Sequence, residues 1–401
     1  MDLFEALDLG RFGPLDERKR NPVRRLRIVI SADWFPPAYR AGGPIRSAFN
    51  LCALLAKHHD VWVVTGAHDL GEAEALDVKR DAWNEMKVGD ASVQVRYCSQ
   101  GTLDRRTWGR ILDEIKPQVL HLNSMFSKEH ALIPLRLTRK RAGMRVVLAP
   151  RGMLGSAALS IKPLKKRVFL SVARMLDLFK GVTWHASASN ESKEVQMHFH
   201  RAHVRIAQNL PTSLPPTNPA RPSDRWRIVV IGRIHRVKNL DFGLRALLRA
   251  NASRPVELDF IGPVEDELYQ RELQAMADAQ QAVKVRFLGG MPPSELPPHF
   301  EAAHFLLSAT TQENFGHSIV ESWAHGCPVL ISDRTPWRQL QEKGIGWDWP
   351  LEEDVWQSGL SEAMALDAAS WDSMSERARD FFKTNVRNDA AEKVNLELFQ
   401  P

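Results

Sequence analysis

The chain has 401 residues, of which 44% are hydrophobic, and a formal net charge of +6. This length and composition allow two domain cores of ordinary size, and no apolar run reaches the ~18 residues of a membrane-spanning helix. Its three cysteines, Cys52, Cys98 and Cys327, are far apart, which predicts neither a disulfide framework nor a zinc site. The first residues lack the basic-then-apolar order of a signal peptide, so we expect a cytoplasmic protein.

Short apolar runs alternate with helical or loop stretches, which predicts α/β structure with mostly parallel sheets. The segment 211–222 contains five prolines and cannot continue a helix. We therefore expect an N-terminal extension (1–22), a first domain (23–210), a linker (211–225), a second domain (226–380) and a C-terminal helix (381–401). Strands are expected at 26–30, 61–65, 93–97, 119–122, 146–149, 182–186, 227–231, 256–261, 283–288, 305–307 and 328–331.

Two glutamates, Glu313 and Glu321, lie eight residues apart around a glycine that precedes an expected helix. The apolar run just upstream predicts a strand, which puts Glu313 in the loop at its carboxyl end and Glu321 about one helical turn in. The helix start offers N–H groups to a phosphate, and the carboxylates can accept hydrogen bonds from sugar and ribose hydroxyls. A sugar-nucleotide site is thus predicted, although both glutamates could instead be helix-start acids favoured by the helix dipole. The other residues of this stretch are Asn314, Phe315, Gly316, His317 and Ser318.

A second group of candidates follows the expected strand at 227–231. Gly232 and Arg233 end this strand, and Lys238 lies at the entry of the next expected helix. The end of a strand in an open α/β sheet is the usual place for a nucleotide diphosphate, and two cations there can stabilise charge on a leaving diphosphate. Taken alone, the same residues are better explained as a basic surface loop, and they become specific only in combination with the glutamate pair.

Polar residues also follow three expected strands of the first domain. Gly42 and Gly43 allow the backbone to approach a ligand, with a structural turn as the alternative, and Arg46 lies one turn further on, where it could meet a phosphate. Asn123 follows the strand at 119–122, where His121 is either a site residue or a core histidine. Arg151 follows the strand at 146–149.

Together these motifs resemble the retaining glycosyltransferases of family 4. The resemblance rests on Gly232-Arg233, Lys238, the glutamate pair, the glycine loop at 41–46 and the Pro-Arg-Gly-Met-Leu segment at 150–154. It implies a GT-B fold, with two Rossmann-like domains whose parallel sheets face each other across a cleft, and a C-terminal helix that packs back on the first domain. Many family members have a catalytic-site histidine near this strand end, where this chain has Arg151. The role of that histidine is therefore not transferred to Arg151.

The resemblance also implies an activity. The expected reaction transfers a sugar from a nucleotide diphosphate sugar to a glycan or lipid-linked saccharide with retention of configuration, as in bacterial surface-polysaccharide synthesis. No cofactor or metal is implied. Arg233, Lys238 and Glu313 would be catalytic, Asn123 and Arg151 would lie on the acceptor side, and the remaining candidates would bind the donor. These donor-binding residues are Gly42, Gly43, Arg46, Gly232, Asn314, Phe315, Gly316, His317, Ser318 and Glu321.

The positive charge is concentrated in one block. Residues 130–176 contain eleven Lys or Arg and no Asp or Glu, which favours an anionic partner. The following stretch, 168–179, is amphipathic if helical, and a basic amphipathic helix is typical of a membrane surface. We therefore expect peripheral contact with the inner face of the membrane, the alternative being a core-facing helix with a solvated basic edge.

Three other functional classes were weighed. A sugar-nucleotide epimerase shares the GT-B fold and stays open as an alternative. A dinucleotide oxidoreductase needs a glycine-rich fingerprint after its first strand, where this chain has Asp33-Trp-Phe-Pro-Pro. A nucleic-acid-binding protein would explain the basic block but not the glutamate pair or the glycine loops, so no nucleic acid is expected.

Overall fold

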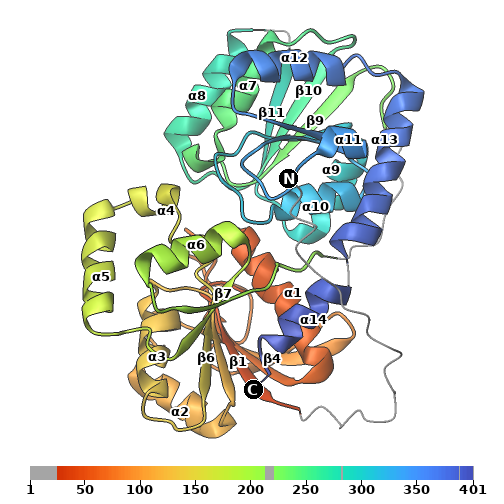
Figure 1. Cartoon of the computed structure of the whole chain (residues 1–401). Helices are drawn as coiled ribbons and strands as arrows, with labels where there is room; N and C mark the ends of the chain where they lie inside the picture. Colours follow the sequence, from red (N-terminus) through yellow and green to blue (C-terminus); the bar gives the residue numbers. More distant parts are fainter. Residues whose placement is uncertain (1–24, 213–220, 281–282, 388, 401) are drawn as a thin grey trace.

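The computed structural model describes residues 25–212, 221–280, 283–387 and 389–400. Two stacked α/β domains are visible in Figure 1, each with a parallel sheet covered by helices. The predicted class, two Rossmann-like domains of the α/β type, is confirmed. The expected extension at 1–22 lies outside the described residues, as do residues 213–220 of the expected linker.

The first domain is built on an eight-stranded sheet of order β3-β4-β2-β1-β5-β6-β7-β8, in which β3 alone is antiparallel to its neighbour. Its elements in chain order are β1 (Arg27–Ser31), α1 (Gly43–His58), β2 (Asp60–Gly66), β3 (Trp83–Val88), β4 (Ala91–Cys98), α2 (Arg105–Ile115), β5 (Val119–Leu122), a π-helical turn (Lys128–Leu132), α3 (Ile133–Thr138), β6 (Arg145–Leu148), α4 (Ser156–Ser160), α5 (Pro163–Met175), β7 (Val182–Ala186), α6 (Ser189–His198) and β8 (His203–Ile206).

The second domain has a six-stranded, fully parallel sheet of order β11-β10-β9-β12-β13-β14. Its elements are β9 (Trp226–Ile231), a 3-10 turn (Arg236–Lys238), α7 (Leu240–Arg249), β10 (Val256–Ile261), α8 (Glu267–Asp278), β11 (Val283–Gly289), a 3-10 turn (Pro293–Glu295), α9 (Pro297–Ala302), β12 (Phe305–Ser308), α10 (His317–Ala324), β13 (Val329–Ser332), α11 (Leu340–Lys343), β14 (Gly346–Trp349), α12 (Glu353–Ala363), α13 (Ala368–Phe381) and a π-helical turn (Phe382–Val386). The last helix of the chain, α14 (Asp389–Glu397), follows them.

The strand order explains where a ligand can lie. In the first sheet the order reverses between β1 and β5, and in the second between β9 and β12. Open α/β sheets bind ligands at the carboxyl ends of the strands beside such a reversal, because the loops there diverge. The loops after β1, β9 and β12 carry Gly42 and Gly43, Arg233, and Glu313, respectively. The topology thus places three separate sequence motifs at the carboxyl edges of the two sheets.

One predicted helix has different limits. The stretch 168–179 was expected to be one amphipathic helix, whereas α5 begins at Pro163 and ends at Met175. Asp177 adopts a left-handed backbone conformation with φ 45°, so the right-handed helix cannot continue through it. Leu178 and Phe179 then turn into the core of the first domain.

The end of the chain returns to the first domain. Helix α14 packs against α1, and Phe399, fully buried, joins the core formed by α1 and the first strands. Arg145 on β6 donates a hydrogen bond to the carbonyl of Gln400 (2.6 Å), and Arg205 on β8 donates one to the carbonyl of Glu397 (3.1 Å). Residues 389–400 are therefore part of the first domain's structure.

Candidate active site

The candidate site is a cleft between the two domains that contains two adjoining cavities. The first, here called the Asn314 cavity, has a volume of about 290 Å³ and the second, the Glu321 cavity, about 280 Å³. Both are lined by residues of the two domains, and they share Gly43, Pro44, Arg151, Arg233, Lys238, Glu313 and His317. An elongated ligand could therefore occupy both at once.

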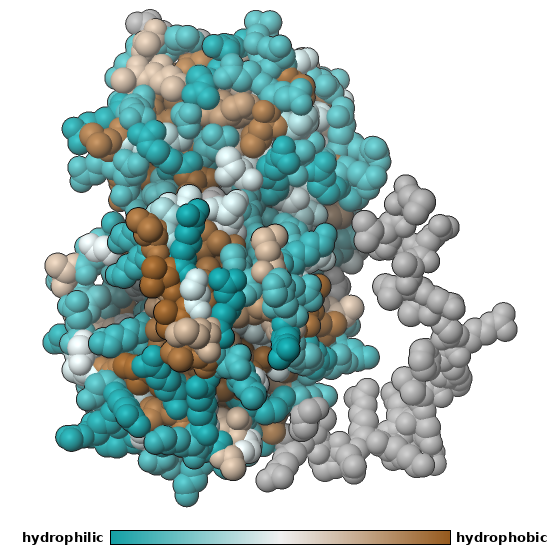
Figure 2. Space-filling model, turned by 60° about the vertical axis from the view of Figure 1, so that its left-hand side comes forward, coloured by the Kyte–Doolittle hydropathy of each residue, from teal (hydrophilic) through white to brown (hydrophobic). Residues whose placement is uncertain are grey.

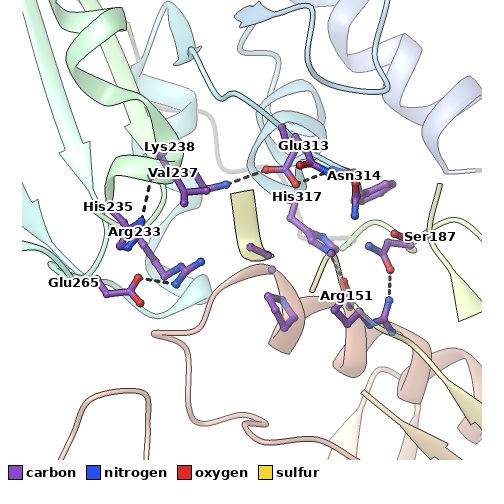
Figure 3. A pocket seen from close by; sticks show the side chains of 18 of the residues that line it. Arg151, Ser187, Arg233, His235, Val237, Lys238, Glu265, Glu313, Asn314 and His317 are labelled. Atoms are coloured by element: carbon purple, nitrogen blue, oxygen red, sulfur yellow. Dashed lines mark hydrogen bonds and ion pairs between the residues drawn. The ribbon is translucent and has the colours of Figure 1, made fainter. Parts of the chain in front are cut away.

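Two cations on the second domain line both cavities, and each is paired with a carboxylate. Lys238 donates a hydrogen bond to Glu313 (2.9 Å), and Arg233 donates one to Glu265 (2.6 Å). Figure 3 shows both pairs at the wall of the pocket. Burial raises the pKa of the Glu313 carboxyl, but the charge of Lys238 and its hydrogen bond outweigh burial, so the net pKa is lowered. Glu313 is therefore ionised at neutral pH and can accept hydrogen bonds only.

Gly232, which precedes Arg233, comes very close to a neighbouring loop. A Cβ atom on Gly262, the residue after β10, would lie 1.9 Å from the carbonyl oxygen of Gly232. The two strand ends can approach in this way because Gly262 has no side chain. Both glycines line the Glu321 cavity, so the close approach of β9 and β10 shapes its floor.

Helix α10 begins within the site. Gly316 precedes it in a left-handed conformation (φ 77°) and no side chain caps the helix start. The first N–H groups of a helix lack partners within it and carry partial positive charge. His317 and Ser318, the first two residues of α10, line the Glu321 cavity, which places this helix start where an anionic group could bind.

Two polar contacts join α10 to α1 across the cleft. The guanidinium of Arg46 donates a hydrogen bond to the buried Glu321, and Ser47 Oγ lies 2.8 Å from His317 Nε2. Burial raises the pKa of Glu321, with Arg46 acting in the opposite direction. From the sequence, Arg46 could meet a phosphate; in this structure its guanidinium is paired with Glu321, and Arg46 lines the Glu321 cavity.

Two buried polar atoms beside the cavities have no hydrogen-bond partner within the described residues: His317 Nδ1 and Asn314 Oδ1. Buried polar atoms are almost always paired, so these two atoms have the capacity to bond a molecule that enters the cavities. Burial first, and the nearby Arg46 second, lower the pKa of His317 to about 3. The imidazole is therefore neutral, and its free ring nitrogen can exchange a hydrogen bond with an uncharged hydroxyl.

The first domain contributes Arg151, which Figure 3 shows across the pocket from Arg233 and Lys238. Its guanidinium donates to Asn123 Oδ1 (2.8 and 3.1 Å) and to Asn209 Oδ1 (2.6 Å), and burial lowers its pKa to about 10. Its φ of 53° is left-handed, a conformation that is uncommon for residues other than glycine and is concentrated at functional sites. Arg151 is held in a fixed orientation by two neutral amides and keeps its positive charge.

The turn after Arg151 lies directly against the loop that carries Glu313. A Cβ atom on Gly155 would be 2.9 Å from Gln312 Nε2, and the same Gln312 amide donates to Glu194 on α6 (2.8 Å). Burial raises the pKa of Glu194, while its bond to Gln312 acts in the opposite direction. The two domains are therefore in contact on the α6 side of the cleft as well as between α1 and α10.

Most of the predicted site residues come together here, with different degrees of access. Asn123 lies behind Arg151 as its support, and neither it nor Gly316 is among the residues that line the two cavities. The Phe315 ring is buried against Trp337 and His317, and Phe315 also lines the Asn314 cavity. His121, left open from the sequence, is a core histidine bonded to Asn123 and His185 and fully buried. The remaining predicted residues line one or both cavities: Gly42, Gly43, Arg46, Arg151, Gly232, Arg233, Lys238, Glu313, Asn314, His317, Ser318 and Glu321.

Sequence reasoning missed several residues that line the cleft. Ser47 contacts His317, Asn209 contacts Arg151, Glu265 is paired with Arg233, and Gln312 contacts Glu194 on α6. No local motif marks them, although Gln312 directly precedes the glutamate motif and could have been included with it. Within the described ranges, no cluster of three or more His, Cys, Asp or Glu side chains could hold a metal ion.

Solved structures with the same architecture identify the fold. Over 94% of its length the chain is similar to sucrose-phosphate synthase from Thermosynechococcus elongatus (98% of that chain, TM-score 0.69, 16% identity). Over 93% it is similar to HepE from Anabaena in complex with UDP and glucose (98%, 0.66, 14%). Over 94% it is similar to WaaG, a glycosyltransferase involved in lipopolysaccharide biosynthesis (100%, 0.65, 14%). At these identities the likeness shows the fold alone, which is the GT-B fold.

Sequence comparison gives a family match for the second domain. Residues 225–352, which include β9 to β14, match the family described as glycosyl transferases group 1. The chain is also 31% identical over 114 residues to the poly(glycerol-phosphate) alpha-glucosyltransferase of Bacillus subtilis (strain 168), an alignment that covers 28% of this chain and 16% of that protein. The matched part of the chain thus spans about a sixth of that relative's length.

Proposed function

We propose that this protein is a glycosyltransferase that moves a sugar from a nucleotide diphosphate sugar to a glycan or lipid-linked saccharide, with retention of configuration. The observation that carries the proposal is the placement of Lys238, Arg233, Glu313 and the start of α10 around one cleft. The cations suit a diphosphate, and the ionised Glu313 suits sugar hydroxyls. The match of residues 225–352 to glycosyl transferases group 1 supports the same reaction class.

In the proposed arrangement the nucleotide occupies the Glu321 cavity and the sugar the Asn314 cavity. Arg233 and Lys238 line both cavities, which is where the diphosphate would join the two parts. As the bond from the anomeric carbon to the diphosphate oxygen breaks, negative charge grows on that oxygen, and fixed cations stabilise it most in the transition state. Neutral His317 and Asn314 would hold sugar hydroxyls through their free polar atoms.

We propose front-face attack for the retaining step. The acceptor hydroxyl oxygen forms the new bond to the anomeric carbon on the face from which the diphosphate leaves, and the hydroxyl proton passes to a leaving phosphate oxygen. Double displacement would need a carboxylate nucleophile. The carboxylates that line the cavities within the described residues are Glu265, Glu313 and Glu321, and each is paired with a cation. This pairing favours binding and positioning over nucleophilic attack.

The donor that we propose to test first is UDP-glucose. HepE has been solved with UDP-glucose and with UDP and glucose, and the Bacillus relative is described as a glucosyltransferase. For the acceptor we propose a saccharide of a bacterial surface polysaccharide, a proposal supported by the likeness to WaaG. The identities with the solved structures are low, so other nucleotides and sugars belong in the same experiment.

The experiment is a donor screen. We expect one of UDP-, GDP- or ADP-glucose to raise the melting temperature of the protein, because ligands that bind only the folded state stabilise it. The matching donor should be consumed only when an acceptor is present, and the product should keep the donor's anomeric configuration by NMR. Absence of a shift with every sugar nucleotide would contradict the proposal. Conversion of the donor sugar without an acceptor would support an epimerase instead.

A second expectation concerns metals. Because Arg233 and Lys238 would neutralise the diphosphate, we expect the transfer rate to stay within about twofold after EDTA treatment. The measurement is the initial rate with and without EDTA, and again after adding Mg²⁺ or Mn²⁺ in excess. Full loss in EDTA that a divalent ion restores would show that a metal supplies this charge.

A further inference from the structure

The basic block predicted from the sequence contains an exposed apolar surface that none of the described residues covers. It runs over α4 and α5 and is here called the α5 stripe. Figure 2 shows it as a brown band between hydrophilic residues that descends from the cleft along the first domain. Its exposed members, six of the ten large apolar side chains exposed among the described residues, are Ile161, Leu164, Val168, Val172, Met175 and Leu176. Such clustering marks an interaction site, whereas scattered exposed apolar residues do not.

The arrangement on α5 follows the helical period. Leu164, Val168 and Val172 recur every four residues and therefore share one face, which is open to solvent. The opposite face carries Leu170 and Ala173, which are buried in the first domain's core. Helix α5 is therefore apolar on two faces, and only one is needed to hold it on the domain. The alternative considered from the sequence was a core-facing helix with a solvated basic edge. That alternative explains the buried face of α5 but not its exposed apolar face.

Positive charge surrounds the exposed face. Lys162, Lys165, Arg167 and Arg174 are exposed beside it, whereas Lys166 turns inward and donates to the Ala158 carbonyl (2.5 Å). Residues 130–176 contain no acid. An apolar face with a basic edge is the pattern of helices that lie in the interface of a membrane with anionic lipids.

We propose that the α5 stripe docks on an anionic lipid bilayer, with its apolar side chains among the lipid tails and its cations at the headgroups. The charge distribution argues against a second copy as the occupant. In a two-fold dimer the same patch faces itself, so these cations would meet cations. A bilayer with negative headgroups satisfies both the apolar face and its charged edge.

The stripe leads into the candidate site. Ile161 belongs to the stripe and also lines the Asn314 cavity, as does Ala158 on α4. A bilayer in contact with α5 would therefore lie beside the entrance of that cavity. An acceptor attached to a membrane lipid could then reach the cavity without leaving the bilayer. This statement about the acceptor, unlike the docking itself, rests on the transferase activity proposed above.

The test is co-sedimentation of the full chain with vesicles. We expect binding to phosphatidylcholine vesicles that contain phosphatidylglycerol and much weaker binding to phosphatidylcholine alone, with release at high salt. Each cation near an anionic surface contributes about fivefold, so Lys165→Ser with Arg167→Ser should lower the partition coefficient roughly 25-fold. Leu164→Ser should lower it on the order of tenfold, because a leucine that enters the bilayer loses contact with water.

Matched changes on the second domain serve as controls. Leu268 on α8 is 64% exposed, compared with 78% for Leu164, and Leu268→Ser should leave vesicle binding unchanged. Arg271→Ser with Lys383→Ser removes the same charge from the second domain and should change the partition coefficient by less than the Lys165 and Arg167 pair. If the two double variants lowered the partition coefficient equally, net charge alone would drive binding and the α5 stripe would not be the docking site.

Two outcomes overturn the proposal. One is that the wild-type chain stays in solution with anionic vesicles at low salt. The other is a lipid-free dimer, seen by sedimentation velocity, that Leu164→Ser converts to a monomer, because the stripe would then be a protein interface. Donor-induced thermal shifts, measured in the same variants without lipid, should equal those of wild type. This keeps a failure of docking distinct from a failure of the proposed activity.

Discussion

Replacing Lys238 with alanine is expected to lower kcat on the order of 100- to 1,000-fold, the usual effect of removing one fixed donor from a developing negative charge. The change also leaves Glu313 without the cation that holds its pKa down, so the sugar contact weakens as well. Arg233→Ala should act in the same direction, because Arg233 lines the same two cavities. The measurement is kcat at saturating donor, together with the melting temperature of each variant.

Arg236 provides the matched control. It lies two residues before Lys238, pairs with Glu272 (2.6 Å) and Asp266 (3.4 Å) on the domain surface and does not line either cavity. Arg236→Ala removes the same charge from the same loop, and its kcat should stay within about twofold of wild type. If Lys238→Ala behaved like Arg236→Ala, the diphosphate would have to bind elsewhere.

Glu321→Ala is expected to weaken donor binding on the order of 10- to 100-fold, the range of hydrogen bonds to a charged group. It should also cost about 3–5 kcal/mol of folding stability, because Arg46 remains in a buried position without its carboxylate. Donor affinity can be measured by calorimetry, and stability by urea unfolding. Turnover at saturating donor should change much less than affinity.

A double variant separates these two effects. Glu321→Ala with Arg46→Ala removes both buried charges and should recover much of the lost stability, while donor affinity stays low. Glu301→Ala is the matched control: it breaks another buried pair, with His325 (2.9 Å), and lines neither cavity. Its stability should fall, and its donor affinity should equal that of wild type. Recovery of affinity in the double variant would mean that Glu321 only holds Arg46.

Most strands that the sequence predicted are largely buried, and the clearest exception is β11, an edge strand whose residues are mostly partly exposed. Runs such as 256–261 have every residue buried, and a continuous apolar run is a strong signal. The sequence did not predict β3, β8 and β14. Strands β3 and β8 are the two edges of the first sheet, with partly exposed, polar sequences, and β14 is a short Gly-Trp-Asp-Trp edge strand. Edge strands contact the core on fewer sides, so their residues need not be apolar.

The sequence predicted those parts of the site that belong to local motifs. The glutamate pair, the glycine loop and the Gly232-Arg233 turn each carry their own sequence pattern. Contacts between the domains have no such pattern: Arg46 with Glu321 and Ser47 with His317 join α1 to a helix that follows more than two hundred residues later. The fixed orientation of Arg151 was equally unpredictable, because its guanidinium is held by Asn123 and Asn209 from other loops.

The return of the chain to the first domain also determines how the cleft can open. The two places where the chain passes between the domains are tied together, because Asn395 on α14 donates to the carbonyl of Gln208 (2.9 Å) and Asn50 on α1 donates to that of Leu210 (2.8 Å). We therefore expect any relative motion of the domains to be a rotation about an axis through this corner. Figure 1 shows α13 and α14 on one side of the molecule, beside the boundary between the domains, and α4 on the opposite side. Displacement grows with distance from the axis, so a small rotation widens the entrance beside α4 most and leaves α14 seated on α1.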